Sequence, residues 1–427
     1  MTVSASTPEE LYAALAGNGP GEIAVQGRLT GLHGITLPPG ASLTGTGDGL
    51  TGTEDAELVF ADGAEGVRLT CDNRVSGLRV AVSDPALRAL HNDTAQPTLG
   101  TLTLIDLTTR GRVELLAKDA LRTGHVTVDG LHIEAADARA AGPRPYGFDV
   151  HVRQGAFTLY NQQTTPDSLL TADLIGISAG REGAPVRGGG VFVSGTERGG
   201  RVEGPRLHTG AVYSDGGIPE HTPGEITGGV FVVWATIREV VNEGPVTTYG
   251  ANDMVLDLWG EVEAWTAREP VTSHGASGIG FVNFGRLGAL RCEAPVVTRG
   301  PGARGFNIYD GTVGAAEFDR IETHADASIG VQVSRPFGTL TVHHGIETHG
   351  GTGESLVKGE MVTLPAIGLS VKSGAHASAI RVDGGIQVHG EGVAPMELAG
   401  TVDELAVTGG VHSSADVGAI PLGAGPA

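Results

Sequence analysis

Glutamate and histidine recur together at a fixed spacing in the sequence, and this pair of residue types can do acid–base chemistry or hold a metal ion. The tetrapeptide Ile-Glu-Thr-His occurs twice, 25 positions apart, with Glu322 and His324 in one copy and Glu347 and His349 in the other. Side chains alternate between the two faces of a strand, so Glu and His point one way while Ile and Thr point the other. With Ile inside, two carboxylates and two imidazoles would lie within about 5 to 7 Å of one another on adjacent strands. We predict Glu322, His324, Glu347 and His349 as catalytic residues. The alternative is a solvated polar ladder with only structural value.

The histidine slot continues along the chain with a fixed period. Steps of 25 residues lead from Tyr249 to His274, Arg299, His324 and His349, each followed by a small residue. Equivalent positions in neighbouring repeats stack on one another, so these side chains would form one row. We predict that Tyr249, His274 and Arg299 contact a substrate.

This period, and not a single motif, indicates the fold. Gly280, Gly305 and Gly330 each open a short run of alternating apolar residues, and similar runs begin at positions 147, 190, 229 and 368. A 25-residue unit of short strands cannot bury its apolar face alone, but a stack of such units can. The sequence therefore predicts an all-β fold, a right-handed parallel β-helix that occupies residues 21–427 as one domain. A β-propeller or β-sandwich remains the alternative, because some gaps are close to 40 residues.

Only the start of the chain gives a clear helical pattern. Thr7 is a good N-cap, Pro8 fits the first helical position, and Glu10 completes a capping box. We expect a short helix within residues 1–20 that covers the open end of the β-helix. A weaker helical pattern lies at residues 113–121.

Breaks in the period are where function tends to lie. Insertions are expected near residues 181–189, 211–227 and 351–365, all at the same corner of the repeat. The two larger ones would bracket a groove of roughly 20 to 25 Å, given about 4.8 Å between strands, and the histidine row would form the floor of this groove. The first of these offers Tyr213 as a substrate-binding residue and Asp215 as a catalytic acid, although Asp-Gly-Gly is also ordinary turn chemistry.

A second outward row is expected on the strand after the histidine slot. Phe192, Phe231 and Val233 make part of that row apolar, which suggests a face covered by an insertion or by another subunit. Its polar members are Asp149, His151, Ser194, Asp257, Tyr309, Ser334 and Lys372.

Composition limits the partners. The formal net charge of −21 would repel nucleic acid and anionic membranes over most of the surface. It also favours a neutral glycan over a polyanion, unless Arg lines the site. Two isolated cysteines, no apparent signal peptide and no 18-residue apolar run lead us to expect a cytoplasmic protein with free thiols. No phosphate loop, dinucleotide fingerprint or Cys-x-x-Cys occurs, so we expect no cofactor.

One segment suggests a known superfamily. The run from Leu37 to Leu43, followed by Gly45-Thr46-Gly47, resembles the first coil of right-handed β-helix proteins of the pectin-lyase-like superfamily. The resemblance covers most of the chain and rests on the repeat spacing and the small-residue corners. The resemblance implies an enzyme that acts on carbohydrate. The polygalacturonase residue pattern occurs here only as fragments, so no catalytic residue is transferred from it.

These observations lead to two functional hypotheses. The first is a carbohydrate-active enzyme that cleaves or rearranges a glycosidic bond of an oligosaccharide or polysaccharide, with carboxylate and histidine groups as acid and base. The second is a non-catalytic β-helix module for binding or assembly, whose ladders are structural. Either could be a dimer or trimer.

Overall fold

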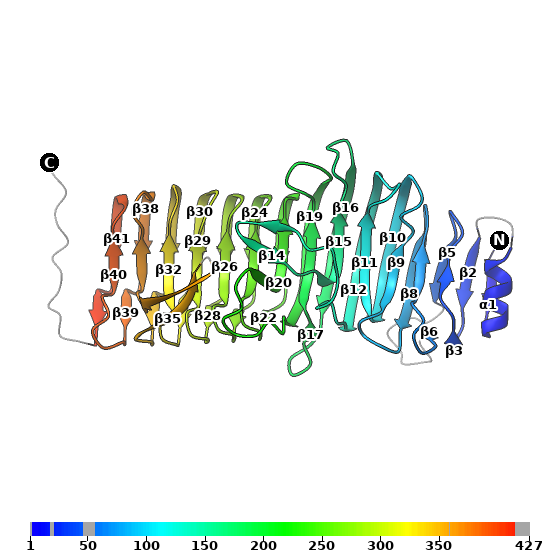
Figure 1. Ribbon diagram of the computed structural model, residues 1–427, viewed down its shortest axis with the longest axis horizontal. Coiled ribbons are helices and arrows are strands. Elements are labelled where there is room, and N and C mark those ends of the chain that lie inside the picture. Colours follow the sequence, from blue (N-terminus) through cyan, green and yellow to red (C-terminus); the bar gives the residue numbers. More distant parts are fainter. Residues whose placement is uncertain (1, 18–20, 46–55, 358, 415–427) are drawn as a thin grey trace.

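The computed structural model describes residues 2–17, 21–45, 56–357 and 359–414. This part of the chain is almost entirely β-structure. It forms an elongated stack of strands with α1 (Pro8–Leu15) near one end and β42 (Val411–Ser413) at the other (Figure 1). The prediction of an all-β chain with one short N-terminal helix is confirmed.

The strands form three parallel rows, which we number in the order in which each repeat contributes its strands. The third row forms a separate sheet, and its strands pair in this order: β4 (Ile35–Thr36), β7 (Val67–Leu69), β9 (Arg88–Asn92), β11 (Arg112–Ala117), β15 (Gly155–Asn161), β18 (Gly189–Ser194), β20 (Glu225–Val233), β23 (Asp253–Leu258), β26 (Ile279–Asn283), β29 (Arg304–Ile308), β32 (Ile329–Val333), β37 (Leu369–Val371) and β40 (Met396–Leu398).

The first and second rows belong to one larger sheet, because long strands in its middle span both. The first row contains β1 (Thr2–Ala5), β2 (Glu22–Val25), β5 (Ser42–Gly45), β21 (Thr236–Asn242), β24 (Glu261–Ala267), β27 (Arg286–Cys292), β30 (Thr312–Phe318), β33 (Phe337–Val342), β38 (His376–Val382) and β41 (Thr401–Val407). The second contains β3 (Arg28–Leu32), β6 (Glu57–Phe60), β17 (Val186–Arg187), β22 (Val246–Thr248), β25 (Val271–Ser273), β28 (Val296–Thr298), β31 (Ile321–Thr323), β34 (Ile346–Thr348), β39 (Ile386–Val388) and β42. The spanning strands are β8 (Arg74–Ala81), β10 (Thr98–Arg110), β12 (Thr123–Ala135), β16 (Leu169–Ala179) and β19 (Arg201–Asp215).

The register follows the sequence period in the regular part of the chain. Met254 pairs with Ile279, and Ile279 pairs with Arg304, so each residue meets its equivalent 25 positions further on. Each such repeat contributes one strand to each row. Among the described strands, antiparallel pairing is confined to two hairpins, whereas propeller blades and sandwiches are built from antiparallel strands. The long parallel sheets are therefore compatible with a β-helix.

Inward-facing residues of the three rows make one hydrophobic core along the stack, which includes Phe281, Phe306 and Trp265. A second, smaller cluster lies on the outer face of the third row. It includes Phe192, Phe231 and Val233, all nearly inaccessible to solvent. The prediction that this apolar face is covered is confirmed, and the cover comes from the chain itself.

The N-terminal helix forms as the capping residues predict. The Thr7 side chain accepts a hydrogen bond from the backbone N–H of Glu10, and the Glu10 carboxylate accepts one from the backbone N–H of Ser6. The helix begins after β1, which the sequence did not suggest. The prediction of a helix at residues 113–121 is wrong. β11 occupies residues 112–117, with Val113 and Leu115 facing the core and a parallel partner strand on each side, and a turn follows it.

The insertions have different structures. In the 351–365 segment, β35 (Thr352–Val357) and β36 (Glu360–Pro365) pair as an antiparallel hairpin. In the 211–227 segment, β19 continues to Asp215 and β20 begins at Glu225, so the added loop is residues 216–224. In the 181–189 segment, a turn is closed by Arg181 and Ala184. Within the segment that resembles a first coil, Thr46 and Gly47 lie outside the described residues.

One segment that the sequence suggested as a repeat strand is a hairpin instead. Residues 147–152 belong to β13 (Tyr146–Gly147) and β14 (Val150–Val152), which pair antiparallel, and β14 then pairs with β20. The repeat strand of that coil is β15. The hairpin lies across the third row (Figure 1), where Val152 packs into the second hydrophobic cluster.

Candidate functional site

The predicted Glu/His cluster forms a compact group on β31 and β34 of the second row and on the residues that directly follow these strands. Ile321 and Thr323 are fully buried, so Glu322 and His324 point outward, as the alternation requires. The imidazoles of His324 and His349 stack with ring centroids 4.7 Å apart and an interplanar angle of 3°. His389, one repeat further, continues the stack at 4.6 Å. We call Arg320, Glu322, His324, Glu347, His349 and His389 the Glu/His corner.

Ion pairs run across this corner. His324 Nε2 lies 2.7 Å from Glu322 Oε1, and Arg320 Nη2 donates to Glu347 Oε2 at 2.7 Å. Burial raises the pKa of Glu347, but its hydrogen bonds with Arg320 and His389 outweigh burial and hold the pKa below its ordinary value. Burial lowers the pKa of His349 despite the neighbouring Glu347 charge. At this corner the ionised form of Glu347 and the neutral form of His349 are therefore favoured.

The other predicted residues along this row include one stacked aromatic pair. Tyr249 stacks on His274 with centroids 5.0 Å apart, and burial is the main cause that raises the pKa of Tyr249 and lowers that of His274. Arg299 is exposed in the next repeat. Asp215 forms an ion pair with Arg187 and accepts a hydrogen bond from the backbone N–H of Gly217 at 2.9 Å, which is a turn interaction. Tyr213, half-buried, lies two residues before Asp215 on β19.

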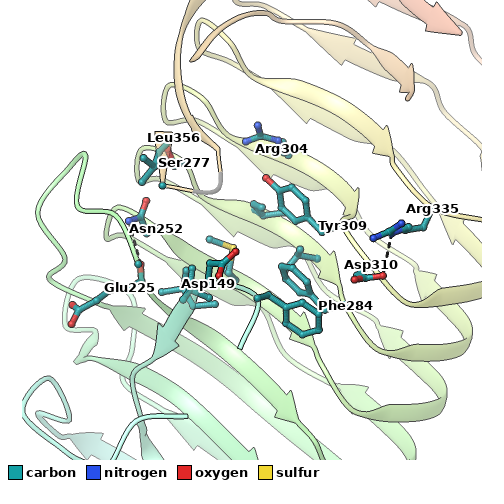
Figure 2. A pocket seen from close by; sticks show the side chains of 18 residues that line it. Asp149, Glu225, Asn252, Ser277, Phe284, Arg304, Tyr309, Asp310, Arg335 and Leu356 are labelled. Carbon is teal, nitrogen blue, oxygen red and sulfur yellow. Dashed lines mark hydrogen bonds and ion pairs between the residues drawn. The ribbon is translucent and has the colours of Figure 1, made fainter. Parts of the chain in front are cut away.

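A pocket of about 190 Å³ opens on the outer face of the third row, between the two hairpins (Figure 2). We call it the hairpin pocket. Its walls are the β13–β14 turn, the start of β20 and the β35–β36 hairpin, and its floor comes from β23, β26 and β29 with the residues that follow them. None of the nine predicted site residues lines it. The predicted insertions at residues 211–227 and 351–365 do bracket this pocket. Its floor, however, is the second outward row and not the histidine row.

Four aromatic side chains form a ladder along one edge of this floor. Trp234, Trp259, Phe284 and Tyr309 follow one another at 25-residue steps. Neighbouring ring centroids are 5.5, 5.6 and 5.4 Å apart, and Phe284 and Tyr309 are stacked at an interplanar angle of 18°. Aromatics are only 4% of this chain, so four consecutive rungs form a local concentration of rings. Flat rings of this kind offer the faces on which sugar rings or other flat ligands pack.

The β13–β14 turn over this ladder is strained. Phe148 and Asp149 both have positive φ angles, 51° and 66°, which are unfavourable for residues with a Cβ. The Phe148 ring packs against Trp259 and Phe284 at 5.0 and 4.6 Å, which holds the turn in place. Strain of about 1 to 3 kcal/mol per residue persists only where the surroundings fix it, and it concentrates at functional sites.

Arg304 is the most unusual group in the pocket. It is 1% exposed, and it stands in a row where the neighbouring repeats have Ile279 and Ile329. Its Nη1 donates to the Gly302 carbonyl at 2.8 Å and to Ser355 Oγ at 3.3 Å. Its Nε and Nη2 have no hydrogen-bond partner, and no carboxylate pairs with it among the described residues. The guanidinium group has the geometry to pair with a carboxylate or another oxyanion.

The carboxylates around the pocket differ in how far they are neutralised. Glu225 is held by Arg144 and Arg153, and Asp310 forms an ion pair with Arg335 at 3.1 Å. Asp149 is exposed and has no hydrogen bond or ion pair within the described part of the chain. Asp149 is thus the free carboxylate of the pocket, and it faces the same opening as Tyr309 (Figure 2).

Two more carboxyl groups are buried beneath this region. Asp253 Oδ2 accepts backbone hydrogen bonds from Gly216 and Gly250, yet burial raises the Asp253 pKa to about 7. Burial also raises the pKa of Asp257 well above its usual range, against a hydrogen bond from Trp259 Nε1 at 3.2 Å. Asp253 ties the 216–224 loop to the stack, and Asp257 supports a rung of the aromatic ladder.

Comparison of the chain with family models, curated proteins and solved structures found no match. Within the described residues, none of the helices is long and apolar enough to cross a membrane.

Proposed function

We propose that the chain is a right-handed parallel β-helix of the pectin-lyase-like kind that binds an acidic oligosaccharide in the hairpin pocket and cleaves it. The stacked repeats and the N-terminal helix support the fold assignment. The pocket supports the function, since it combines a stacking surface with one buried, unpaired cation.

The observation that carries the proposal is Arg304. Burying a charge without a partner is costly, so an unpaired guanidinium in an otherwise apolar row calls for a ligand that pairs with it. The chain as a whole is acidic, which would repel an anionic sugar, but Arg304 supplies local positive charge. A uronate carboxylate on Arg304, with its ring against Tyr309 and Phe284, satisfies both features of the floor.

The polar groups favour elimination over hydrolysis. Hydrolysis of a glycoside uses two carboxyl groups, one as acid and one as base or nucleophile. Here Glu225 and Asp310 are held by arginines, which leaves Asp149 alone. With the uronate carboxylate neutralised by Arg304, Asp149 takes the proton from C5, the C4–O4 bond breaks as the C4–C5 double bond forms, and the Tyr309 hydroxyl protonates the leaving oxygen.

The test is a screen of matched acidic and neutral oligosaccharides, with products identified by mass. The proposal expects an unsaturated product from a uronate-containing substrate, and loss of that product in Asp149→Asn and Tyr309→Phe. Products that gain water would replace elimination by hydrolysis. Activity on neutral glycans only would contradict the role of Arg304.

The alternative is a non-catalytic module that binds the same acidic glycan. Among the described pocket residues only Asp149 is a free carboxylate, and this favours the alternative because a binding site needs no acid–base pair. Tight binding of a uronate oligosaccharide whose mass stays unchanged after long incubation would establish this alternative.

A further inference from the structure

We infer that the Glu/His corner is a binding site for one divalent transition-metal ion of the zinc type, held by Glu322 Oε1, His324 Nε2 and His349 Nε2. This site is distinct from the hairpin pocket and does not depend on the proposed function.

The first argument is the position of the ligand atoms. The three atoms lie within 4.8 Å of one another, on side chains from two adjacent repeats. Ligand atoms around a tetrahedral zinc ion lie about 3.3 Å apart, given Zn–N bonds of about 2.0 to 2.1 Å. Small rotations of the side chains bring the three atoms onto such a sphere. Two imidazoles and one carboxylate leave a fourth position for water, as at catalytic zinc sites.

The second argument is the state of His324 Nε2. It is shielded from solvent and makes no hydrogen bond of acceptable geometry, although Glu322 Oε1 lies only 2.7 Å away. A shared ion would relieve this contact, because it would hold the two atoms about 3.3 Å apart in its coordination sphere. His389 Nε2, by contrast, has a hydrogen bond with Glu347 Oε1 at 2.9 Å. This difference favours the Glu322, His324 and His349 trio over the neighbouring Glu347, His349 and His389 trio.

The third argument is the support around the ligands. The near-parallel stack of His324 and His349 directs equivalent edges of both rings the same way. Arg320 lies beside the Oε2 atoms of Glu322 and Glu347, at 3.8 and 2.7 Å, and leaves the Oε1 atoms facing the imidazoles. Partners that orient first ligands in this way are the usual second layer of a metal site.

The experiment titrates the chelator-treated full chain with Zn²⁺ by calorimetry and with Co²⁺ by visible absorption, in excess Mg²⁺. We expect one tight site and a Co²⁺ spectrum of low coordination number. His324→Asn and Glu322→Gln should each weaken binding at least tenfold. The matched control is His343→Asn, which removes an exposed histidine paired with Glu317 at 2.8 Å outside the corner and should leave binding unchanged.

Circular dichroism of the metal-free variants checks that each is folded, and two different ligand variants guard against a single folding failure. The proposal is overturned if wild-type protein binds no stoichiometric ion. Equal affinity in wild type, His324→Asn and Glu322→Gln would also overturn it, as would an equal loss in His343→Asn.

Discussion

The Glu/His corner and the hairpin pocket lie on the same stack of repeats, but the charged groups are paired at the corner and unpaired at key positions of the pocket. At the corner, carboxylates, imidazoles and Arg320 are partly exposed and compensate one another. In the pocket, Arg304 is buried and has free donors, while Asp149 is exposed and unpaired. A compensated cluster can be stable without a ligand, whereas an uncompensated buried charge indicates that something else completes it.

This difference explains why we place the glycan in the pocket, whereas the metal ion at the corner is inferred from the positions of the ligand atoms. The residues predicted as catalytic at the corner, Glu322, His324, Glu347 and His349, remain an untested prediction for glycan chemistry. Four changes, in order of decreasing expected effect, would break or sharpen the comparison.

The largest effect is expected for Asp253→Asn, beneath the pocket. A carboxyl group with a folded-state pKa of about 7 and an unfolded value near 3.8 stabilises the fold fully only below the lower value, and this stability is lost as pH rises through 7. The loss is about 4 kcal/mol of unfolding free energy between pH 4 and pH 8. The variant, whose amide oxygen can still accept from Gly216 and Gly250, should lose that part of the pH dependence. Urea unfolding at both pH values measures it, and an unchanged pH slope would contradict it.

Arg304→Met should weaken binding of an acidic oligosaccharide about 100-fold, equivalent to about 2.7 kcal/mol. The same variant should be no less stable than wild type, since an apolar side chain suits this row. Calorimetric binding and thermal unfolding test the two halves separately. Arg335→Gln, an exposed arginine, is the control and should have a much smaller effect. If both arginine variants weaken binding equally, the pocket is a general basic patch.

Tyr309→Ala should weaken glycan binding by about tenfold, because one stacking surface is worth about 0.5 to 1.5 kcal/mol. Tyr309→Phe keeps the ring and should retain binding while turnover falls. Titration of both variants beside a product assay separates the two roles. Equal binding by Tyr309→Ala and wild type would remove the aromatic ladder from the account.

The smallest effect is expected for Glu347→Gln at the corner. Its ion pairs are partly exposed, so the unfolding free energy should change by less than about 1 kcal/mol. Glycan turnover should be unchanged, because the pocket has its own polar groups. If turnover were lost while the variant remained folded, the corner would be the catalytic centre after all.

The sequence shows a 25-residue period. This period was enough to predict that Glu322 and His324 point outward and that each strand residue pairs with its equivalent in the next repeat. It did not reveal the β13–β14 hairpin, because alternation of apolar residues predicts a strand without specifying its partner. Residues 147–152 have the same alternation of apolar residues as the repeat strands. In the structure, however, β13 and β14 pair with each other across a tight turn.

The aromatic ladder could have been found by the method that found the histidine row. Trp234, Trp259, Phe284 and Tyr309 have the same 25-residue spacing. Arg304 was harder to identify, because its burial depends on Ser355 and the β35–β36 hairpin, 51 positions away in the chain. No local pattern predicts which insertion will cover which rung.

The most direct test of the central claim is a crystal structure of the Asp149→Asn variant with a bound uronate oligosaccharide. The account predicts a sugar ring over Tyr309 and Phe284, with its carboxylate within hydrogen-bonding distance of Arg304. An oligosaccharide bound at the Glu/His corner, or one in the pocket with no acidic group near Arg304, would contradict it.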